Sequence, residues 1–548
     1  MPRIDNKQSD TTRGGIVFPR FFIQLAAAAL SGGLLAVSFP APGVSWAAWF
    51  ALTPLLLAAR KASVAPGFLY GFTSGVIYFA VTFSWMFHVA GYRVLHHAIL
   101  HTYLGCYVGI FAFLYGLIGR KSGDVTALLT APLIWIVLEY IRSNLGFLSY
   151  PSTLLGHSQY QEISVSQIAA FTGVYGVSFL IVLVNTGWIA LGFLASTRFY
   201  SRTPHRIPKV SNRGMASIFA ISALALAAAI GFSLWVTRQE IKGTPVKVAV
   251  IQGNIGQGQK WDPRYAGRIM KTYESLSLEA AGESPQLIIW PESATPRSIN
   301  QDGRIMKRVQ NIADATGAFL LLGSSYAQKF KELEQTELGY HNSAFLIAPH
   351  KFQEVQRYDK IRLLPFGEYL PYPQRIPWQW ISIPPLEGFK PGTDFTVFNI
   401  GKVRFAVNIC WETIFSDLTR EFVKRGAQFI VNLSNEAWFG KSAAPYQFLS
   451  ISVFRAIENG VFVIRSANTG VSCIIDPYGR ILQRVEDESG TDIFVEGWIT
   501  GHIIPIESKT LYSRAGDWWV ALSAIGALWA ILSSLFRKTG RPSPLPRD

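Results

Sequence analysis

The stretch Val403-Arg-Phe-Ala-Val-Asn-Ile-Cys-Trp-Glu412 joins an apolar run, typical of a buried strand, to a cysteine and then to a carboxylate. A thiol at the end of a buried strand can be held rigidly, and a helix that begins just after it favours the thiolate. The stretch therefore predicts a strand of an α/β domain that ends in a reactive residue, Cys410.

Two more charged residues occupy similar positions upstream. Glu292 ends the apolar run Leu287-Ile-Ile-Trp-Pro-Glu292, and Lys360 lies within Arg357-Tyr-Asp-Lys-Ile-Arg-Leu-Leu-Pro-Phe-Gly-Glu368. A base, a cation and a nucleophile are the components of a Glu-Lys-Cys acyl-transfer site. The three residues lie far apart in the sequence, so only a particular fold can bring them together.

Four motifs in order carry a resemblance to a known family: WPE (290–292), YDK with LLPFGEYLP (358–371), NICWE (408–412) and NLSNEAWFG (432–440). They resemble the nitrilase superfamily, and the membrane segments described below narrow the resemblance to its membrane-bound branch, the apolipoprotein N-acyltransferase family. The resemblance covers most of the chain. One departure is Trp411, where many relatives are expected to carry tyrosine, a change that affects acyl-chain packing but leaves the nucleophile intact.

The resemblance implies a four-layer αββα sandwich and a role for each motif residue. Glu292 is the general base that takes the proton of Cys410, and Lys360 stabilises the oxyanion together with the backbone N–H that follows Cys410. Glu368 and Glu412 match supporting positions, which orient Lys360 and the incoming amine. Taken alone, Glu412 fits a surface ion pair equally well.

The composition separates a membrane part from a water-soluble part. Hydrophobic residues make up 49% of the 548 residues and charged residues 16%, which is too apolar for an ordinary soluble protein. Residues 1–235 hold five of the 35 acidic residues. We expect a helical membrane domain over 1–236, a nitrilase-like catalytic domain over 237–514, and a C-terminal membrane helix with a basic tail over 515–548.

Apolar runs long enough to span a bilayer, about 20 residues each, define the membrane topology. They lie near 19–39, 67–90, 98–119, 125–142, 168–195, 215–236 and 517–536, with a shorter run near 45–60. We therefore expect about eight transmembrane helices. The first run is a retained anchor rather than a signal peptide, because it is long and many spans follow it.

Basic clusters at every second connection set the expected orientation. They are Arg3 to Arg20, Arg60-Lys61, Arg120-Lys121, Arg198 to Arg213, and Arg537 to Arg547. Both termini are then cytoplasmic and residues 237–514 periplasmic, in a multi-pass protein of the bacterial inner membrane. The net charge of +15 is mostly this bias, so nucleic acid is not an expected partner.

Cysteines and histidines leave two alternatives open. Cys410 and Cys473 lie outside the spans, so a disulfide between them competes with a free nucleophile. His97 and His101 have the i,i+4 spacing of a helical metal pair, although interfacial histidines that face lipid headgroups are commoner. No second ligand set is evident, and we expect neither a metal nor an organic cofactor.

From Val246 onward, short β-rich runs alternate with helical stretches, which indicates a layered α/β domain. The expected helices are 268–281, 304–316, 415–425 and 446–460. Residues 363–395 are irregular and rich in proline and aromatic residues. We interpret this segment as a mobile lid at the membrane surface that opens for each substrate.

Tryptophans near the motifs are candidates for substrate binding. Trp261, Trp411 and Trp438 flank the motifs, and in a soluble enzyme most would be core residues. Beside a membrane, Trp261 and Trp438 are candidates for an acyl-chain pocket.

The function implied by the resemblance is a ping-pong acyl transfer. A phospholipid donates an acyl chain to Cys410 as a thioester, and the N-terminal amine of S-diacylglyceryl-cysteine in an apolipoprotein accepts it. A membrane-anchored amidase, in which water replaces the amine, and a non-enzymatic lipid-binding scaffold are the alternatives. Seven spans before the domain favour lipid substrates, because a simple tether needs only one. The headgroup, the acyl chain and the oligomeric state stay open.

Overall fold

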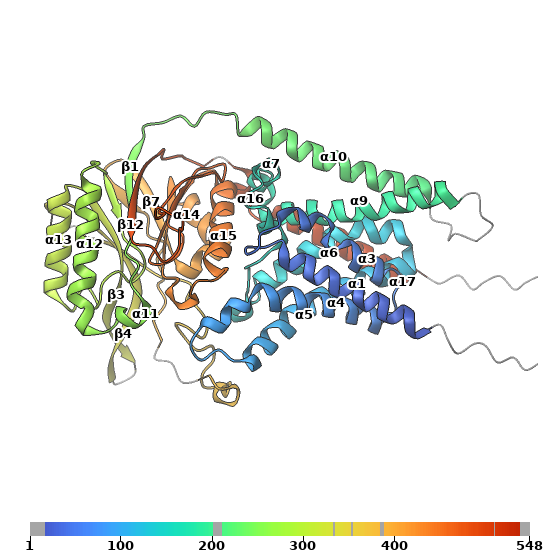
Figure 1. Cartoon of the computed structure of the whole chain (residues 1–548), viewed down its shortest axis with the longest axis horizontal. Coiled ribbons are helices and arrows are strands. Elements are labelled where there is room, and N and C mark those ends of the chain that lie inside the picture. Colours follow the sequence, from blue (N-terminus) through green and yellow to red (C-terminus); the bar gives the residue numbers. More distant parts are fainter. Residues whose placement is uncertain are drawn as a thin grey trace, which may run out of the picture.

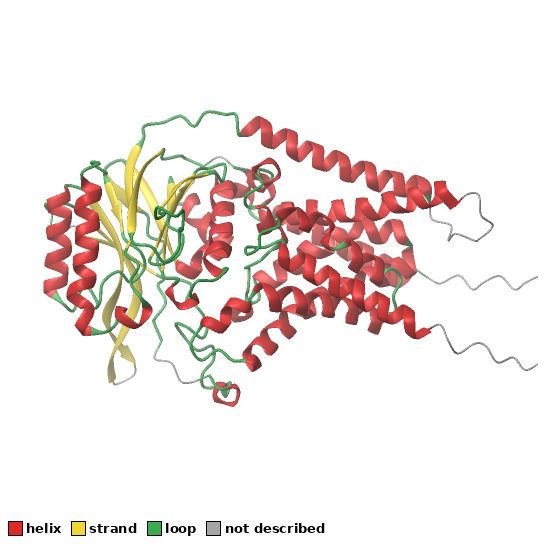
Figure 2. Ribbon diagram, viewed as in Figure 1, coloured by secondary structure: helices red, strands yellow, loops and turns green. Residues whose placement is uncertain are grey.

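The computed structural model describes residues 17–200, 211–332, 335–351, 355–383, 388–508 and 510–537. The chain forms a helical bundle and an α/β domain that lie end to end (Figure 1), and every strand belongs to the α/β domain (Figure 2). This division agrees with the expected fold class of a membrane domain joined to a nitrilase-like domain.

Seven helices of the described residues are long and apolar enough to cross a membrane. They are α1 (Val17–Val37), α4 (Val64–Thr82), α5 (Val94–Ser122), α6 (Asp124–Ser143), α9 (Val174–Tyr200), α10 (Asn212–Val236) and α17 (Trp518–Phe536). Glycines bring α4 and α5 into close contact: a Cβ on Gly71 would lie 2.2 Å from the carbonyl oxygen of Val108. Small residues at such crossings let backbones approach closely in a membrane.

The run predicted as a span over 45–60 has a different form. It is divided into η1 (Ser45–Ala47), α2 (Ala48–Ala51) and α3 (Thr53–Ala59). The break falls just before Pro54, which has no backbone N–H and cannot continue α2. Asn185 on α9 stabilises the break, because its side-chain oxygen accepts the backbone N–H groups of Leu52 at 2.9 Å and Thr53 at 3.0 Å. The run is short and broken. It nevertheless leads to the end of the bundle that lies away from the α/β domain, where Arg60 pairs with Asp124 at the start of α6.

The run predicted as a span over 168–195 also begins later than expected. Residues Ala169–Thr172 form the separate short helix α8, and α9 begins only after Gly173. Gly173 has a φ of 68°, a left-handed conformation that ends α8. The membrane crossing is therefore made by α9 alone.

Two six-stranded sheets form the centre of the α/β domain. The first has the order β12-β1-β2-β3-β4-β5 and the second β11-β10-β9-β8-β7-β6. The strands of the first sheet are β1 (Val246–Gln252), β2 (Leu287–Ile289), β3 (Phe319–Glu332), β4 (Gln335–Ile347), β5 (Val355–Asp359) and β12 (Gly497–Ile503). Those of the second are β6 (Phe398–Ile400), β7 (Val403–Ile409), β8 (Phe429–Ser434), β9 (Phe462–Ala467), β10 (Cys473–Ile475) and β11 (Ile481–Arg484).

The sheets pack face to face between two pairs of helices. Side chains alternate along β1: Val248 and Val250 belong to the core shared with the second sheet, and Ala249 and Ile251 pack toward the outer helices. Those outer helices are α12 (Ala266–Ala281) and α13 (Gly303–Thr316), and α14 (Ser416–Lys424) and α15 (Ala444–Asn459) cover the other face (Figure 1). The result is the αββα sandwich that the resemblance implied.

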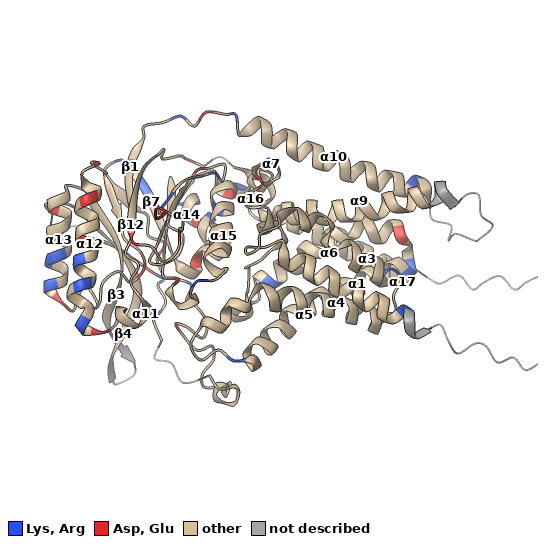
Figure 3. Ribbon diagram, viewed as in Figure 1, with Lys and Arg blue, Asp and Glu red and all other residues tan. Residues whose placement is uncertain are grey.

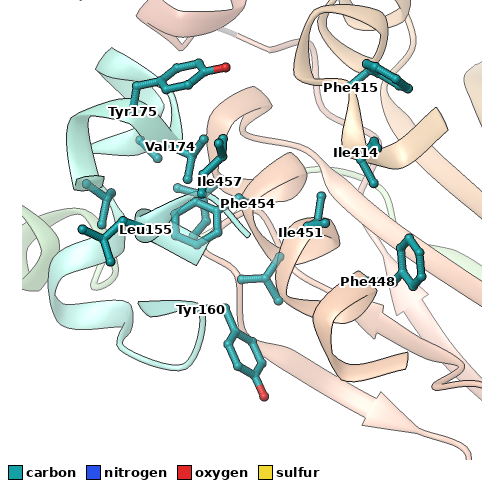
Figure 4. Packing of buried hydrophobic residues seen from close by; sticks show 14 of the residues in the cluster. Leu155, Tyr160, Val174, Tyr175, Ile414, Phe415, Phe448, Ile451, Phe454 and Ile457 are labelled. Carbon is teal, nitrogen blue, oxygen red and sulfur yellow. The ribbon is translucent and has the colours of Figure 1, made fainter. Parts of the chain in front are cut away.

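Helix α15 joins the α/β domain to the bundle. Phe454 and Ile457 of α15 lie beside Leu155 and Val174 of the bundle (Figure 4). Gln447, also on α15, accepts a hydrogen bond from Trp85 and donates to the carbonyl oxygens of Pro40 and Thr82. One hydrophobic core therefore runs from the second sheet through α15 into the bundle and fixes the position of the α/β domain.

Candidate active site

The backbone at Cys410 turns sharply out of strand β7. Cys410 opens the 3-10 helix η7 (Cys410–Ile414) and has a φ of 50°, which is rare for a residue with a side chain. Backbone strain of this kind persists only where the surroundings hold it in place. Here Glu412 does so, because its carboxylate accepts the backbone N–H of Ile409 at 2.8 Å. The thiol is free and partly exposed.

Glu292 lies just past the end of β2, and its carboxylate is fixed by two hydrogen bonds. Asn342 of β4 donates its side-chain N–H to Oε1 at 2.8 Å, and the backbone N–H of Asn435 donates to Oε2 at 2.8 Å. Glu292 is 6% exposed. A carboxylate held this way at a fixed orientation is suited to act as a general base.

Lys360 follows β5 and lies between two carboxylates. Its Nζ is 2.9 Å from Glu368 and 3.8 Å from Oε1 of Glu292. Asn342 links the same two carboxylates, since it also donates to Oε1 of Glu368 at 2.8 Å. Lys360 is 1% exposed, so its positive charge acts in a medium of low polarity, where it interacts strongly with nearby negative charge.

The charges of this cluster change the proton affinities of its members. Burial would lower the pKa of Lys360, but Glu368, Glu292 and Cys410 outweigh burial and raise it above its ordinary value. Burial, reinforced by the charge of Glu292, raises the pKa of the Cys410 thiol to about 12, against the opposing effect of Lys360. The resting nucleophile is therefore a neutral thiol beside a base and needs that base to remove its proton.

The fold explains why distant residues meet here. Strands β2, β5, β7 and β8 run in the same direction within their sheets, and their carboxyl ends gather at one edge. Glu292, Lys360, Cys410 and Ser434 each lie at or just past one of those ends. Ligand and catalytic sites of α/β proteins commonly form at this edge.

Two comparisons with known proteins bear on this site. Residues 247–496 match the family model described as "Carbon-nitrogen hydrolase", and residues 31–187 match "Apolipoprotein N-acyltransferase N-terminal domain". An apolipoprotein N-acyltransferase of Geobacter metallireducens is 36% identical over 521 residues, which are 93% of this chain and 95% of that protein. The chain belongs to the apolipoprotein N-acyltransferase family.

A second relative also matches over nearly the whole chain. The apolipoprotein N-acyltransferase of Nitrosomonas europaea is 30% identical over 95% of this chain and 98% of its own length. Among solved structures, an amidase from Nesterenkonia sp. covers 52% of this chain and 98% of its own chain, at 18% identity and a TM-score of 0.36.

Glu412 lies behind the two turns that carry Lys360 and Cys410. It is fully buried, and besides Ile409 its carboxylate accepts the Tyr358 hydroxyl at 2.7 Å and the backbone N–H groups of Ile361 and Arg362. Glu412 thus ties the turn that carries Lys360 to the turn that carries Cys410. Glu368 contacts Lys360 directly.

The three tryptophans have different surroundings. Trp261 is half-exposed and lines a cavity of about 770 Å³, whose walls also include Arg297, Ser298 and Gln301. Trp438 is half-exposed on η8 (Ala437–Phe439). Trp411 is buried and packs on Tyr150 of the bundle, with ring centroids 5.8 Å apart. Trp411 therefore serves the junction of the two domains in this member of the acyltransferase family.

A polar chain behind the nucleophile is absent from the sequence-based prediction. The Ser434 hydroxyl lies 3.7 Å from Cys410 Sγ and 2.9 Å from Glu436, which forms a fully buried ion pair with Arg465. The motif NLSNEAWFG contains Ser434 and Glu436, so their position was marked, but only the structure shows that the hydroxyl reaches the thiol. The sequence also showed no sign that Lys260 contacts the main chain of Glu292.

The structure bears on the possible Cys410–Cys473 disulfide and on the possible metal pair His97 and His101. Cys410 and Cys473 are both free thiols, so the competing disulfide is not formed. The rings of His97 and His101 are in contact, with centroids 3.8 Å apart and planes tilted by 58°. Within the described ranges, no group of three or more His, Cys, Asp or Glu side chains is placed to hold a metal ion.

Proposed function

We propose that this chain transfers an acyl chain from a phospholipid, through a thioester on Cys410, to the N-terminal amine of S-diacylglyceryl-cysteine in apolipoproteins. The observation that carries the proposal is the buried Glu292–Lys360–Glu368 cluster around a free thiol, at the edge of a sandwich docked on a membrane bundle. Membership of the apolipoprotein N-acyltransferase family supports the same reaction.

In the first half-reaction, Glu292 removes the proton of Cys410 as the sulfur attacks an ester carbonyl of the phospholipid. Lys360 stabilises the tetrahedral oxyanion, aided by the backbone N–H that follows Cys410. The carbon–oxygen ester bond then breaks. Glu292 returns the proton to the departing oxygen, and a lysophospholipid leaves the acyl-enzyme.

In the second half-reaction, the amine of the diacylglyceryl cysteine attacks the thioester. Glu292 accepts the proton that the amine loses, the carbon–sulfur bond breaks, and the proton returns to Cys410. The overall reaction converts an ester into a more stable amide. Acyl transfer therefore does not require ATP.

The orientation of the bundle supports a periplasmic catalytic domain and cytoplasmic termini. Basic residues gather at the end of the bundle away from the α/β domain (Figure 3), where Arg60 and Lys61 both pair with Asp124. An excess of Lys and Arg marks the cytoplasmic side of bacterial inner-membrane proteins. The start of α1 and the end of α17 lie at this basic end (Figure 1).

The segment 363–395 is the proposed lid through which lipid substrates reach the site from the bilayer. In the described part of it, Trp380 is 82% exposed and Tyr372 is 55% exposed. Tyr372 packs on Phe147 of the bundle, and His96 at the start of α5 donates to the carbonyl oxygen of Ile381 at 2.6 Å. Exposed aromatics beside the bundle suit the membrane interface. Residues 384–387 of the proposed lid lie outside the described ranges.

The experiment that tests the proposal supplies both substrates. Purified protein, phospholipid and a synthetic S-diacylglyceryl-cysteinyl peptide are mixed, and lipid and peptide products are followed by mass spectrometry. We expect one lysophospholipid for each N-acylated peptide. Release of free fatty acid in place of N-acyl peptide, with the peptide present, would instead establish a hydrolase, the amidase-like alternative.

A further inference from the structure

Lys260 is a second buried lysine beside the acyl-transfer cluster. It ends the short helix α11 (Gln257–Lys260) and is only 2% exposed. Its Nζ donates a hydrogen bond of 3.0 Å to the main-chain carbonyl oxygen of Glu292. The opposite end of the same helix is also attached to the site, because Gln257 accepts a hydrogen bond from the side chain of Asn435.

The cluster without Lys260 has an excess of negative charge. Glu292 and Glu368 are carboxylates, Lys360 is the cation between them, and the Cys410 thiol is neutral at rest. An unbalanced charge in a poorly polar interior is costly and hinders formation of a further anion. Transfer of the Cys410 proton to Glu292 moves a negative charge onto sulfur and leaves the excess in place, so a second cation nearby stabilises the cluster before and after the transfer.

We propose that Lys260 is a positioning residue of this site, whose ammonium group holds the carbonyl of Glu292 and supplies the second positive charge that Cys410 requires. The inference rests on the proposed function. Glu292 and Cys410 are the groups whose charges act on Lys260. Burial lowers the pKa of Lys260 to about 8, so Lys260 still carries its charge at neutral pH.

The test compares Lys260→Met with Lys271→Met, which removes the same charge from an exposed position on α12. Full-length purified protein reacts with iodoacetamide between pH 6 and pH 10, and the Cys410 peptide is quantified by mass spectrometry. In Lys260→Met we expect the labelling rate at pH 7.5 to fall about tenfold, as a rise of about one unit in the pKa of Cys410 would give. The deficit should shrink above pH 8, where Lys260 of the original protein loses its own charge. Lys271→Met should match the original protein, and Lys260→Arg, which keeps the charge, should recover most of the labelling rate at pH 7.5.

An unchanged labelling rate at pH 7.5 in Lys260→Met, or an equal loss at every pH, would overturn the proposal and leave Lys260 a structural residue. Labelling needs no lipid, so this result is independent of whether acyl transfer occurs. If Lys260→Met does not fold, the original protein decides: its acyl-enzyme formation should decline above about pH 8, as Lys260 loses its proton. A rate that stays level from pH 8 to pH 10 contradicts the proposal.

Discussion

Glu368→Gln tests how Lys360 is held between two carboxylates. At an effective dielectric constant of about 20, attraction to a full charge is about 6 kcal/mol at 2.9 Å and about 4 kcal/mol at 3.8 Å. Without the charge on Glu368, Lys360 is drawn toward Glu292 and makes it a weaker base. Glutamine keeps an acceptor for Lys360, so about half of the attraction to Glu368 is retained, and we expect the barrier to acyl-enzyme formation to rise by about 3 kcal/mol.

An increase of that size slows acyl-enzyme formation about 100-fold. The assay mixes purified protein with phospholipid in detergent micelles, stops the reaction at set times, and measures the acylated fraction by intact mass. Glu488→Gln, at an exposed position, is the matched control, and thermal unfolding checks that both variants fold. A Glu368→Gln rate within about threefold of the original would show that Glu292 alone holds Lys360, and would refute this reasoning.

Three further predictions follow from the geometry. Ser434→Ala removes the hydroxyl that lies 3.7 Å from Cys410 Sγ. Because Ser434 lowers the pKa of Cys410, that pKa should rise in the variant and iodoacetamide labelling at pH 8 should slow several-fold. An unchanged labelling rate would count against the contact. Phe454→Ala opens a cavity in the domain junction and should lower the free energy of unfolding in denaturant by about 3–5 kcal/mol, with Leu482→Ala as an exposed control. A reporter active only outside the cytoplasm should work when fused after residue 240 and fail at residue 205; the reverse pattern would place the site in the cytoplasm.

The sequence predicted those parts of the fold that local patterns determine. Strand β7 begins at Val403 and ends just before Cys410, as its mainly apolar run predicts, because a strand buried over most of its length is rich in apolar residues. The polar strand β5 (Val355–Asp359) was missed, although it delivers Lys360. Its residues are mostly half-buried at the edge of the first sheet, so hydrophobicity did not mark them.

Features that depend on distant residues were not predictable. The backbone N–H groups of Leu52 and Thr53 at the break between α2 and α3 bind Asn185, more than one hundred positions away in the chain. The motif cysteine was recognised, but the burial of Trp411 depends on Tyr150 of the bundle. Lys260 lies in the polar stretch Gln257-Gly-Gln-Lys260, which resembles a surface turn. Only the approach of α11 to the turn at Glu292 makes it part of the site.

The most direct test of the central claim is the mass of the Cys410 peptide after the protein is incubated with phospholipid alone. The account predicts an increase equal to one acyl chain on Cys410, reversed by an added amine acceptor. Cys473, which is fully buried, should stay unmodified, and Cys410→Ala should give no adduct while remaining folded. An acyl group on another residue, or near-normal transfer by Cys410→Ala, would contradict the account.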